Sequence, residues 1–410
     1  MFCATLPCLV GVAVIFAGIS NVAYIPLMEG VVDTYQARVI STFARVVRIV
    51  GGVAESLGLE TPDNVARAMT DFILSDNTPP PPTDHLKVED YTFDGVPVRL
   101  YRPTAAAKPS PSVIYLHGGG WTILHIDSFD DILSDYAVTS GYVFISIEYP
   151  LAPENPFPKP FETCLTAVLH VLSQAGSYGL DAEKVAIAGD SAGGNLAAAV
   201  SLKLSELKDV PKLRFQWLIY PALQAFTFKT PSYLSKEDAS PYFNDGATMA
   251  HYWCNYMGIN TPRMKEAFRT NHHTSRKLKQ SIYASYVDSK LLPKEFRGDR
   301  PGETRLDYGD DEISNEVEKI ILNPYFAPLM APDLSGVAPA FVVTAEFDVL
   351  RDDGLMYAQR MKDAGVDVVV YNSPGSIHGF LSFFEGLIPK YTDTDHTIGK
   401  FVKYAREHFK

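Results

Sequence analysis

A short motif centred on Ser191 has the residue types and the spacing that nucleophilic catalysis needs. An apolar strand predicted over Val185–Ala188 leads directly into Gly189-Asp-Ser-Ala-Gly193, and an apolar helical stretch over Leu196–Leu204 follows. Glycines on both sides of the serine permit a sharp strand-to-helix turn, which lifts the hydroxyl clear of the sheet. The Ala192 backbone N–H would then lie at a helix N-terminus, where it favours developing negative charge. We therefore predict that Ser191 is a nucleophile.

A second glycine-rich motif, His117-Gly118-Gly119-Gly120-Trp121, follows a strand predicted over Val113–Leu116. Consecutive glycines let backbone N–H groups turn toward an acyl oxygen, as an oxyanion hole requires. We expect the N–H groups of Gly118 and Gly119 to join that of Ala192 there, while His117 holds the loop by hydrogen bonding. A phosphate-binding loop is the alternative, but no Lys-Ser/Thr follows these glycines.

A nucleophilic serine needs a base, and the base needs a carboxylate to orient it. In hydrolases with this serine turn, the acid and then the histidine follow along the chain, each in a loop after a strand. Asp348 follows a strand predicted over Phe341–Thr344, and His378 follows one predicted over Val366–Tyr371. Asp348 and His378 are therefore the predicted acid and base.

Other titratable residues have simpler explanations. Glu346, Asp352 and Asp353 flank Asp348, and the last two precede a helical stretch over Leu355–Ala364 that we expect them to cap. The remaining histidines are expected to make ordinary hydrogen bonds. No Cys or His cluster has zinc spacing, so no metal is predicted, and no motif indicates a cofactor.

Apolar stretches that alternate with helical stretches predict an α/β fold with a mainly parallel sheet. The predicted strands are Val113–Leu116, Val143–Ile147, Val185–Ala188, Phe215–Tyr220, Phe341–Thr344 and Val366–Tyr371. A hairpin around Asp94-Gly95 precedes them. Between Pro221 and Asn323 the sequence is polar, punctuated by proline and rich in aromatic residues, which predicts an insertion between two strands that covers the site.

Composition excludes some classes of protein. Of the 410 residues, 46% are hydrophobic and 20% are charged, a balance that excludes a disordered chain. The formal net charge is -12, and no run of Lys and Arg occurs, so nucleic acid is not an expected partner. The chain has four cysteines, too few for a disulfide framework.

The N-terminal segment Phe2–Leu27 carries no charge, and we predict that it is an uncleaved transmembrane anchor. A cleaved signal peptide is an alternative, although no basic region precedes the apolar run; a buried first helix is another. Beyond it, an amphipathic helix is predicted over Arg38–Leu59. The first basic residues are Arg38, Arg45 and Arg48, so the positive-inside rule favours a cytosolic main domain.

Taken together, these motifs resemble a known family. His117–Trp121, Gly189–Asn195, Asp348 before Leu350-Arg-Asp-Asp-Gly354, and His378-Gly379 resemble the hormone-sensitive-lipase branch of α/β-hydrolases. More narrowly, the chain resembles arylacetamide deacetylase and neutral cholesterol ester hydrolase. The resemblance implies the α/β-hydrolase fold with a helical cap, with Ser191, Asp348 and His378 as the triad and His117-Gly118-Gly119 forming the oxyanion hole. It also implies a single-pass protein of the endoplasmic reticulum with a lumenal catalytic domain. Because the positive-inside rule favours a cytosolic domain, the side of the membrane stays open.

The chain departs from the family pattern at several positions. The family pairs a Cys just after the HGGGW motif with another three residues before the catalytic Asp; here those positions are Thr122 and Ala345, so that disulfide cannot form. Pro150 stands where the family usually has Arg, and Gly375-Ser-Ile377 replaces an acidic-Gly-Phe lead-in to the histidine. Neither of the last two changes removes a catalytic group.

The sequence predicts five segments: an anchor (1–27), a helical cap segment with a proline linker (28–85), the first part of the core (86–222), a cap insertion (223–322) and the second part of the core (323–410). The predicted function is a membrane-anchored serine carboxylic-ester hydrolase that acts on apolar lipid or xenobiotic esters through an acyl-enzyme. Arylacetamide-type amide deacetylation would use the same triad. A non-catalytic hydrolase-fold receptor is a third alternative, although such proteins typically lose a triad residue.

Overall fold

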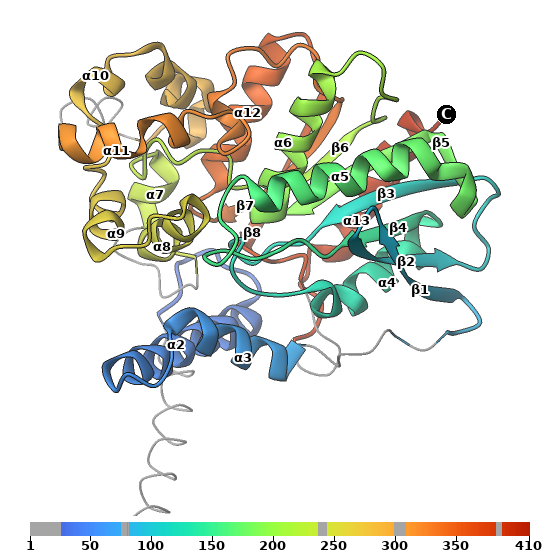
Figure 1. The fold of residues 1–410 in the computed structure, drawn as a ribbon, viewed down its shortest axis with the longest axis horizontal. Helices are drawn as coiled ribbons and strands as arrows, with labels where there is room; N and C mark the ends of the chain where they lie inside the picture. The colour runs from blue at the N-terminus through green and yellow to red at the C-terminus, as the bar shows by residue number, and fades with distance from the viewer. Residues whose placement is uncertain (1–25, 75–79, 81, 237–243, 299–308, 383–387) are drawn as a thin grey trace, which may run out of the picture.

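The computed structural model describes residues 26–74, 80, 82–236, 244–298, 309–382 and 388–410. Its centre is one eight-stranded sheet in the order β1-β2-β4-β3-β5-β6-β7-β8 (Figure 1). The strands are β1 (Leu86–Phe93), β2 (Val96–Pro103), β3 (Ser110–Leu116), β4 (Val143–Ile147), β5 (Leu180–Asp190), β6 (Gln216–Ile219), β7 (Ala340–Phe347) and β8 (Val368–Ile377). Every predicted strand is present.

The sheet is mainly parallel, as predicted. From β4 to β8 each neighbouring pair runs parallel, whereas β2 is antiparallel to both β1 and β4. The predicted hairpin turns at Asp94 (φ 47°) and Gly95 (φ 87°), two positive φ values that match the right-handed twist of the flanking strands. Parallel strands leave their carboxyl ends at one edge, where Ser191 and the Gly-rich loop therefore meet.

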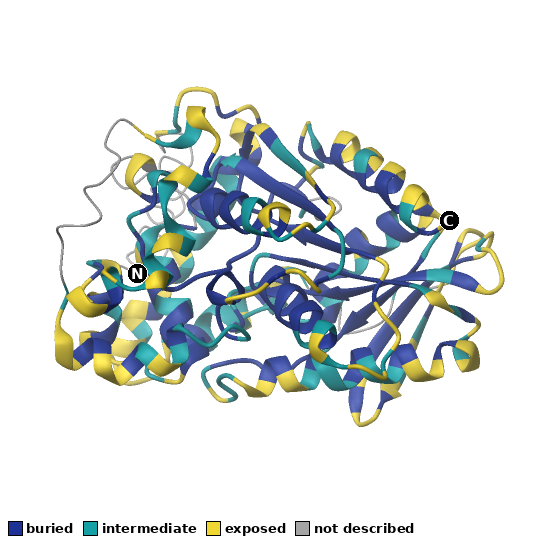
Figure 2. Ribbon diagram, turned by 90° about the horizontal axis from the view of Figure 1, so that it is seen from above, coloured by how far each residue is buried: buried dark blue, intermediate teal, exposed yellow. Residues whose placement is uncertain are grey.

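Helices cover both faces of the sheet, so alternate residues of a strand enter different cores (Figure 2). In β5, Val185 and Ile187 pack on one side, while Ala186 and Ala188 pack on the other. The first core is completed by α5 (Lys159–Gln174), α6 (Ala192–Glu206) and α12 (Arg351–Asp363), and the second by α4 (Asp130–Ser140) and α13 (Thr394–His408).

The segment between Pro221 and Asn323, where an insertion is predicted, is helical and lies between β6 and β7; we refer to it as the cap. Its helices are α7 (Pro231–Lys236), α8 (Gly246–Met257), α9 (Pro262–Arg269), α10 (Arg276–Lys279) and α11 (Asp311–Ile321). The cap also contains the short 3₁₀ turns η3 (Ile282–Val287), η4 (Ser289–Leu291) and η5 (Lys294–Phe296). Other such turns are η1 (Ile126–Phe129), η2 (Ala175–Tyr178) and η7 (Pro328–Met330). The predicted amphipathic helix is α2 (Thr34–Ser56), which packs with α3 (Pro62–Leu74) at the cap end of the molecule (Figure 1).

The predicted membrane anchor over 1–27 falls outside the described residues except for its last two positions. Among the helices that the structure describes, none combines the length and the apolar character that a bilayer span needs.

The prediction that Asp352 and Asp353 cap a helix is wrong. Helix α12 begins at Arg351, and its N-cap residue makes no side-chain capping bond. Both carboxylates are instead fully buried, where Asp352 accepts from the Ser232 N–H at 2.7 Å and Asp353 from the Leu223 N–H at 3.1 Å. Burial raises the pKa of Asp353 to about 8. Both carboxylates lie in the first turn of α12 and face inward. Through these two bonds they hold the start of the cap segment against the core.

Candidate active site

The structure brings the three predicted triad residues into one chain of hydrogen-bond contacts. Ser191 Oγ lies 3.0 Å from His378 Nε2, and His378 Nδ1 lies 2.7 Å from Asp348 Oδ2. Ser191 follows β5, Asp348 follows β7 and His378 follows β8, so each sits at the carboxyl end of its strand. A serine, an imidazole and a buried carboxylate in this order form the geometry that activates a serine hydroxyl.

Ser191 lies in the sharp turn that the glycines permit. Its φ of 53° is rare for a residue with a side chain. A Cβ at Gly189 would lie 2.3 Å from the Gly193 oxygen, and a Cβ at Gly193 would lie 1.9 Å from the Leu116 oxygen. Only glycine fits at both positions, because strand β5, helix α6 and the end of β3 meet there without room for another atom.

Both oxygens of Asp348 are held. While Oδ2 faces His378, Oδ1 accepts from the Leu350 N–H at 2.9 Å and from Asn244 Nδ2 at 3.0 Å. Asp348 is buried, at 2% exposure, so these bonds fix the orientation of its carboxylate. Asn244 lies in the cap insertion, and no spacing in the sequence pointed to it.

The Gly-rich loop departs from its predicted use at Gly118. The Gly118 N–H donates to Asp190 Oδ1 at 2.8 Å, so it is not a free oxyanion donor as we had expected. The N–H groups of Gly119, Gly120 and Ala192 donate to no acceptor among the described residues. The two glycines have φ values of 103° and 59°, a backbone conformation that the loop can adopt because they lack a side chain.

Asp190, which precedes the nucleophile, is a site residue that the sequence analysis missed. Its Oδ1 accepts from the Tyr115 hydroxyl at 2.8 Å as well as from Gly118. Burial raises the pKa of this carboxyl to about 6. The bond to Gly118 links the turn that carries Ser191 to the Gly-rich loop. A charged residue at the end of a buried strand was the available signal.

His117 supports the loop, as predicted, and its ring does not contact the triad. It is fully buried, its Nδ1 lies 2.8 Å from the Gly118 oxygen, and its ring stacks on Tyr149 at 4.2 Å. The Tyr149 hydroxyl donates to the His117 oxygen at 2.6 Å. Burial lowers the pKa of His117 to about 4, so the ring is neutral at pH 7.

Acidification is expected to cost stability through His117. Its folded pKa of about 4 lies below the ordinary value of 6.5, so the unfolded chain binds the proton first and stability falls as the pH drops from 6.5 toward 4. Between pH 7 and pH 5 this loss amounts to about 2 kcal/mol. Urea unfolding of wild type and His117→Gln should show the stability difference between them shrinking by that amount, whereas exposed His85→Gln should follow wild type. An unchanged difference would contradict the assignment.

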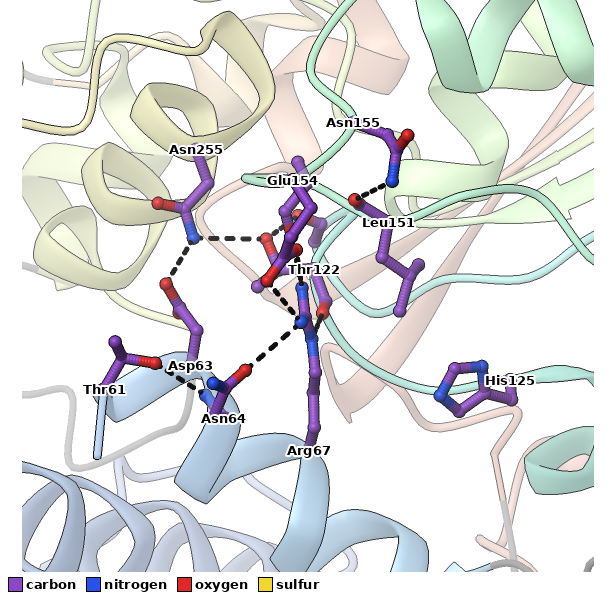
Figure 3. A network of polar contacts seen from close by, with 12 residues as sticks. Thr61, Asp63, Asn64, Arg67, Thr122, His125, Leu151, Glu154, Asn155 and Asn255 are labelled. Carbon is purple, nitrogen blue, oxygen red and sulfur yellow. Dashed lines mark hydrogen bonds and ion pairs between the residues drawn. The ribbon is translucent and has the colours of Figure 1, made fainter. Parts of the chain in front are cut away.

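A polar network joins the N-terminal helix α3 to the loop after the Gly-rich motif (Figure 3). Arg67 donates through Nε to the Thr122 oxygen and through Nη2 to the Ala152 oxygen, each at 2.7 Å. It also pairs with both oxygens of Glu154, at 2.8 and 2.6 Å. Because these partners belong to loops that flank the site, Arg67 fixes α3 against them.

Cap helix α8 enters the same network. Asp63 of α3 pairs with His251 at 2.7 Å and accepts from Asn255 Nδ2 at 3.0 Å. Asn255 Nδ2 also donates to Thr122 Oγ1 at 3.3 Å. Thr122 is the residue that stands in place of the family's cysteine. Hydrogen bonds across this position therefore link the loop to the cap and to α3.

Removing the Arg67 side-chain donors is expected to lower the free energy of unfolding by about 2–3 kcal/mol, since buried carbonyls and Glu154 lose charge-assisted bonds. Thermal unfolding of Arg67→Met would measure the loss. The matched control is Arg263→Met, because Arg263 pairs with Glu312 at 3.4 Å where both side chains are more than half exposed. Equal effects of the two substitutions would show that the network has no special role.

The departure at Gly375-Ser-Ile377 also has a structural counterpart. The Gly375 oxygen accepts from the Val32 N–H at 3.0 Å, and the Gly375 N–H donates to Glu346 Oε2 at 2.8 Å. A Cβ at Gly375 would lie 2.3 Å from Val32 Cγ2. The segment before α2 thus packs on β8, the strand that leads to His378, and a larger residue at position 375 would displace that segment.

A cleft of about 920 Å³ lies beside the polar network around Arg67. Its lining residues include Arg67, His125, Glu148, Pro150 and Lys159. None of the three triad residues lines it. The hydrogen-bond geometry around Ser191, rather than the size of a cavity, therefore identifies the candidate active site.

A family model described as the alpha/beta hydrolase fold matches residues 113–286 and 298–382, more than half of the chain. The chain belongs to the α/β-hydrolase family. The matched ranges contain both glycine-rich motifs and all three residues of the Ser191–His378–Asp348 chain, so the family and the geometry point to the same site.

This α/β-hydrolase is 36% identical to arylacetamide deacetylase of Bos taurus over 369 residues, 88% of this chain and 90% of that protein. It is 32% identical to neutral cholesterol ester hydrolase 1 of Rattus norvegicus, over 90% of this chain and 92% of that protein. A solved ester-hydrolase from the metagenome of Lake Arreo aligns with a TM-score of 0.61 and 28% identity, over 90% of this chain and 98% of that chain. The resemblance and the prediction of an esterase-type enzyme are confirmed.

Proposed function

We propose that this α/β-hydrolase is a membrane-anchored serine carboxylic-ester hydrolase that acts on apolar esters through an acyl-enzyme. The observation that carries the proposal is the contact chain from Ser191 Oγ through His378 to Asp348, at 3.0 and 2.7 Å. A neutral imidazole that faces a serine hydroxyl on one side and a buried carboxylate on the other can take the serine proton and bear the resulting charge.

The proposed reaction has two acyl-transfer steps. His378 takes the Ser191 proton as Oγ bonds to the ester carbonyl carbon, and then returns that proton to the leaving alcohol as the ester C–O bond breaks. A water molecule then gives its proton to His378 and attacks the acyl-enzyme carbonyl carbon. His378 passes that proton to Ser191 Oγ as the acyl C–O bond breaks, which frees the acid and restores the serine. The N–H groups of Gly119, Gly120 and Ala192 are the proposed donors to the oxyanion, because the Gly118 N–H is bonded to Asp190.

An apolar ester is the proposed substrate. The cap packs aromatic side chains over the Gly-rich loop: a Cβ at Gly120 would lie 2.4 Å from the Tyr252 ring, and Trp121 stacks on Tyr256 at 4.4 Å. The names of the relatives, a deacetylase of arylacetamides and a cholesterol ester hydrolase, support the same class. The uncharged Phe2–Leu27 segment supports a membrane anchor, and we propose the endoplasmic reticulum membrane as its location on the family resemblance.

Fluorophosphonate labelling of detergent-solubilised protein tests the proposal directly. Wild type should react at one site, and Ser191→Ala should not, because the probe requires an activated serine. Absence of labelling in folded wild type would overturn the hydrolase proposal and favour the non-catalytic receptor.

Amide deacetylation is the second candidate, since the relative with 36% identity is named as a deacetylase of arylacetamides. The same residues would serve it, because the two reactions differ only in the leaving group. Parallel kcat/KM measurements on matched short-acyl anilides and phenyl esters, alongside a long-chain lipid ester, separate an amidase from a lipid esterase. A higher kcat/KM for the anilide would replace the ester assignment.

A further inference from the structure

The N-terminal helices expose a concentration of large apolar side chains. Among the described residues, ten of the fourteen exposed large apolar side chains lie between residues 32 and 73, while the other four are scattered at Val138, Leu234, Ile282 and Val369. We call seven of the ten the α2–α3 apolar face; they lie on the second half of α2, at its C-cap and near the end of α3, and they are Val46, Ile49, Val50, Val53, Leu57, Phe72 and Ile73. Helices α2 and α3 pack against each other, and exposed apolar side chains gathered on such a pair mark an interaction site rather than ordinary solvent exposure.

Helix α2 carries this surface on one side only. Val46, Ile49, Val50, Val53 and Leu57 follow helical spacing and are 39–65% exposed. The buried residues of the same helix are small or polar, namely Gln36, Ala37, Ser41 and Gly51. A helix that packs on a protein core and faces water has the opposite arrangement. The exposed side of α2 is therefore built for an apolar environment outside the protein.

Charge and chain position identify that environment. Helix α2 contains Arg38, Arg45 and Arg48 but a single acidic residue, Glu55. Although Arg48 pairs with Asp245 of the cap at 3.2 Å, the helix stays net basic, and a basic amphipathic helix is complementary to anionic lipid headgroups. The uncharged segment ends at Leu27, seven residues before Thr34, a distance of at most about 25 Å along an extended chain. A bilayer that holds this segment lies within reach of α2.

We infer that the α2–α3 apolar face docks on the surface of a phospholipid bilayer, as a second membrane contact beyond the anchor. The inference rests on the proposed membrane function and extends it: the docked face shares α3 with Arg67 and Asp63, which bond to the loop after the Gly-rich motif and to α8. The helix that is bonded to the loop after the Gly-rich motif would then lie against the membrane in which apolar esters dissolve.

Tryptophan fluorescence of the full chain in vesicles tests the contact. The three native tryptophans, Trp121, Trp217 and Trp253, are fully buried, so bromine atoms on lipid acyl chains should leave their emission unchanged. Val53→Trp adds a reporter on the α2–α3 apolar face, and Ile282→Trp adds one at a similarly exposed position on η3. In phosphatidylcholine–phosphatidylserine vesicles with brominated chains, the added Val53→Trp emission should fall at least twofold, and that of Ile282→Trp should not change.

An activity measurement separates this inference from the proposed function. The double variant Ile49→Glu/Val53→Glu should lose about tenfold in hydrolysis of a long-chain ester dissolved in vesicles, because charge on the face opposes burial in the interface. Its hydrolysis of a water-soluble short-chain ester should stay within twofold of wild type. Unquenched Val53→Trp in a protein that hydrolyses the soluble ester would overturn the docking alone, as would a dimer that covers the face. Wild type without esterase activity would instead overturn the proposed function.

Discussion

Replacing Ser191 with alanine is expected to lower kcat for ester hydrolysis by about 10⁵- to 10⁶-fold. Without Oγ no acyl-enzyme forms, and the remaining oxyanion donors and bound water support only a slow direct hydrolysis. His378→Ala should be about as damaging, because the serine then has no base at 3.0 Å. Steady-state hydrolysis of a p-nitrophenyl ester by the detergent-solubilised full chain measures both losses.

Ser173→Ala is the matched control for Ser191→Ala, since Ser173 lies exposed on α5 and its hydroxyl donates to the His170 oxygen of the same helix at 3.1 Å. It should retain full activity. Thermal unfolding of the Ser191 variant should stay close to that of wild type, because the lost hydroxyl is not buried in the core. Activity of Ser191→Ala within tenfold of wild type would assign the nucleophile to another residue.

Asp348→Asn is expected to lower kcat by about 10⁴-fold while the fold is kept. In wild type, Oδ1 accepts hydrogen bonds from the Leu350 N–H at 2.9 Å and from Asn244 Nδ2 at 3.0 Å. The side-chain oxygen of the new asparagine should take that place. The amide NH₂ must then face His378 Nδ1, which makes that nitrogen an acceptor and places the ring proton on Nε2. In that tautomer the histidine cannot take the serine proton.

The rival carboxylate provides the comparison. Glu346→Gln should reduce kcat only several-fold, because Glu346 bonds to the Gly375 N–H and supports the strand before His378 without contacting the ring. Hydrolysis rates of both variants at pH 7 and pH 9 distinguish the roles, since only loss of the triad acid should leave a rate that rises steeply with pH. Equal losses in the two variants would contradict the assignment of Asp348.

Much of the candidate site could be predicted because its constraints are local. The strand, Gly-x-Ser-x-Gly turn and helix around Ser191 are contiguous in the chain, and the clash that a Cβ at Gly193 would make with the Leu116 oxygen requires glycine there. Asp348 and His378 followed from strand order, since parallel strands bring their carboxyl ends to one edge. No comparable rule of chain order predicts their hydrogen-bond partners, such as Asn244 beside Asp348.

The hydrogen bond of the Gly118 N–H to Asp190 could not be predicted from the sequence. Consecutive glycines indicate that N–H groups can turn inward, but Asp190 lies 72 residues away along the chain, and only the packing of β3 beside β5 shows which N–H it takes. Asp352 and Asp353 fit a capping pattern equally well. Their burial against the chain that enters the cap became apparent only from the fold.

By itself the sequence determined the α/β class, the strand order of the catalytic residues and the turn at Ser191, because backbone sterics and hydrophobic periodicity act over a few residues. Only the tertiary structure decided that the Gly118 N–H bonds to Asp190, that Asn244 from the cap holds Asp348, and that α2 exposes Val46, Val50 and Val53. Those features depend on which distant segments share a surface, and a hydrogen bond or an exposed face exists only once the chain has packed.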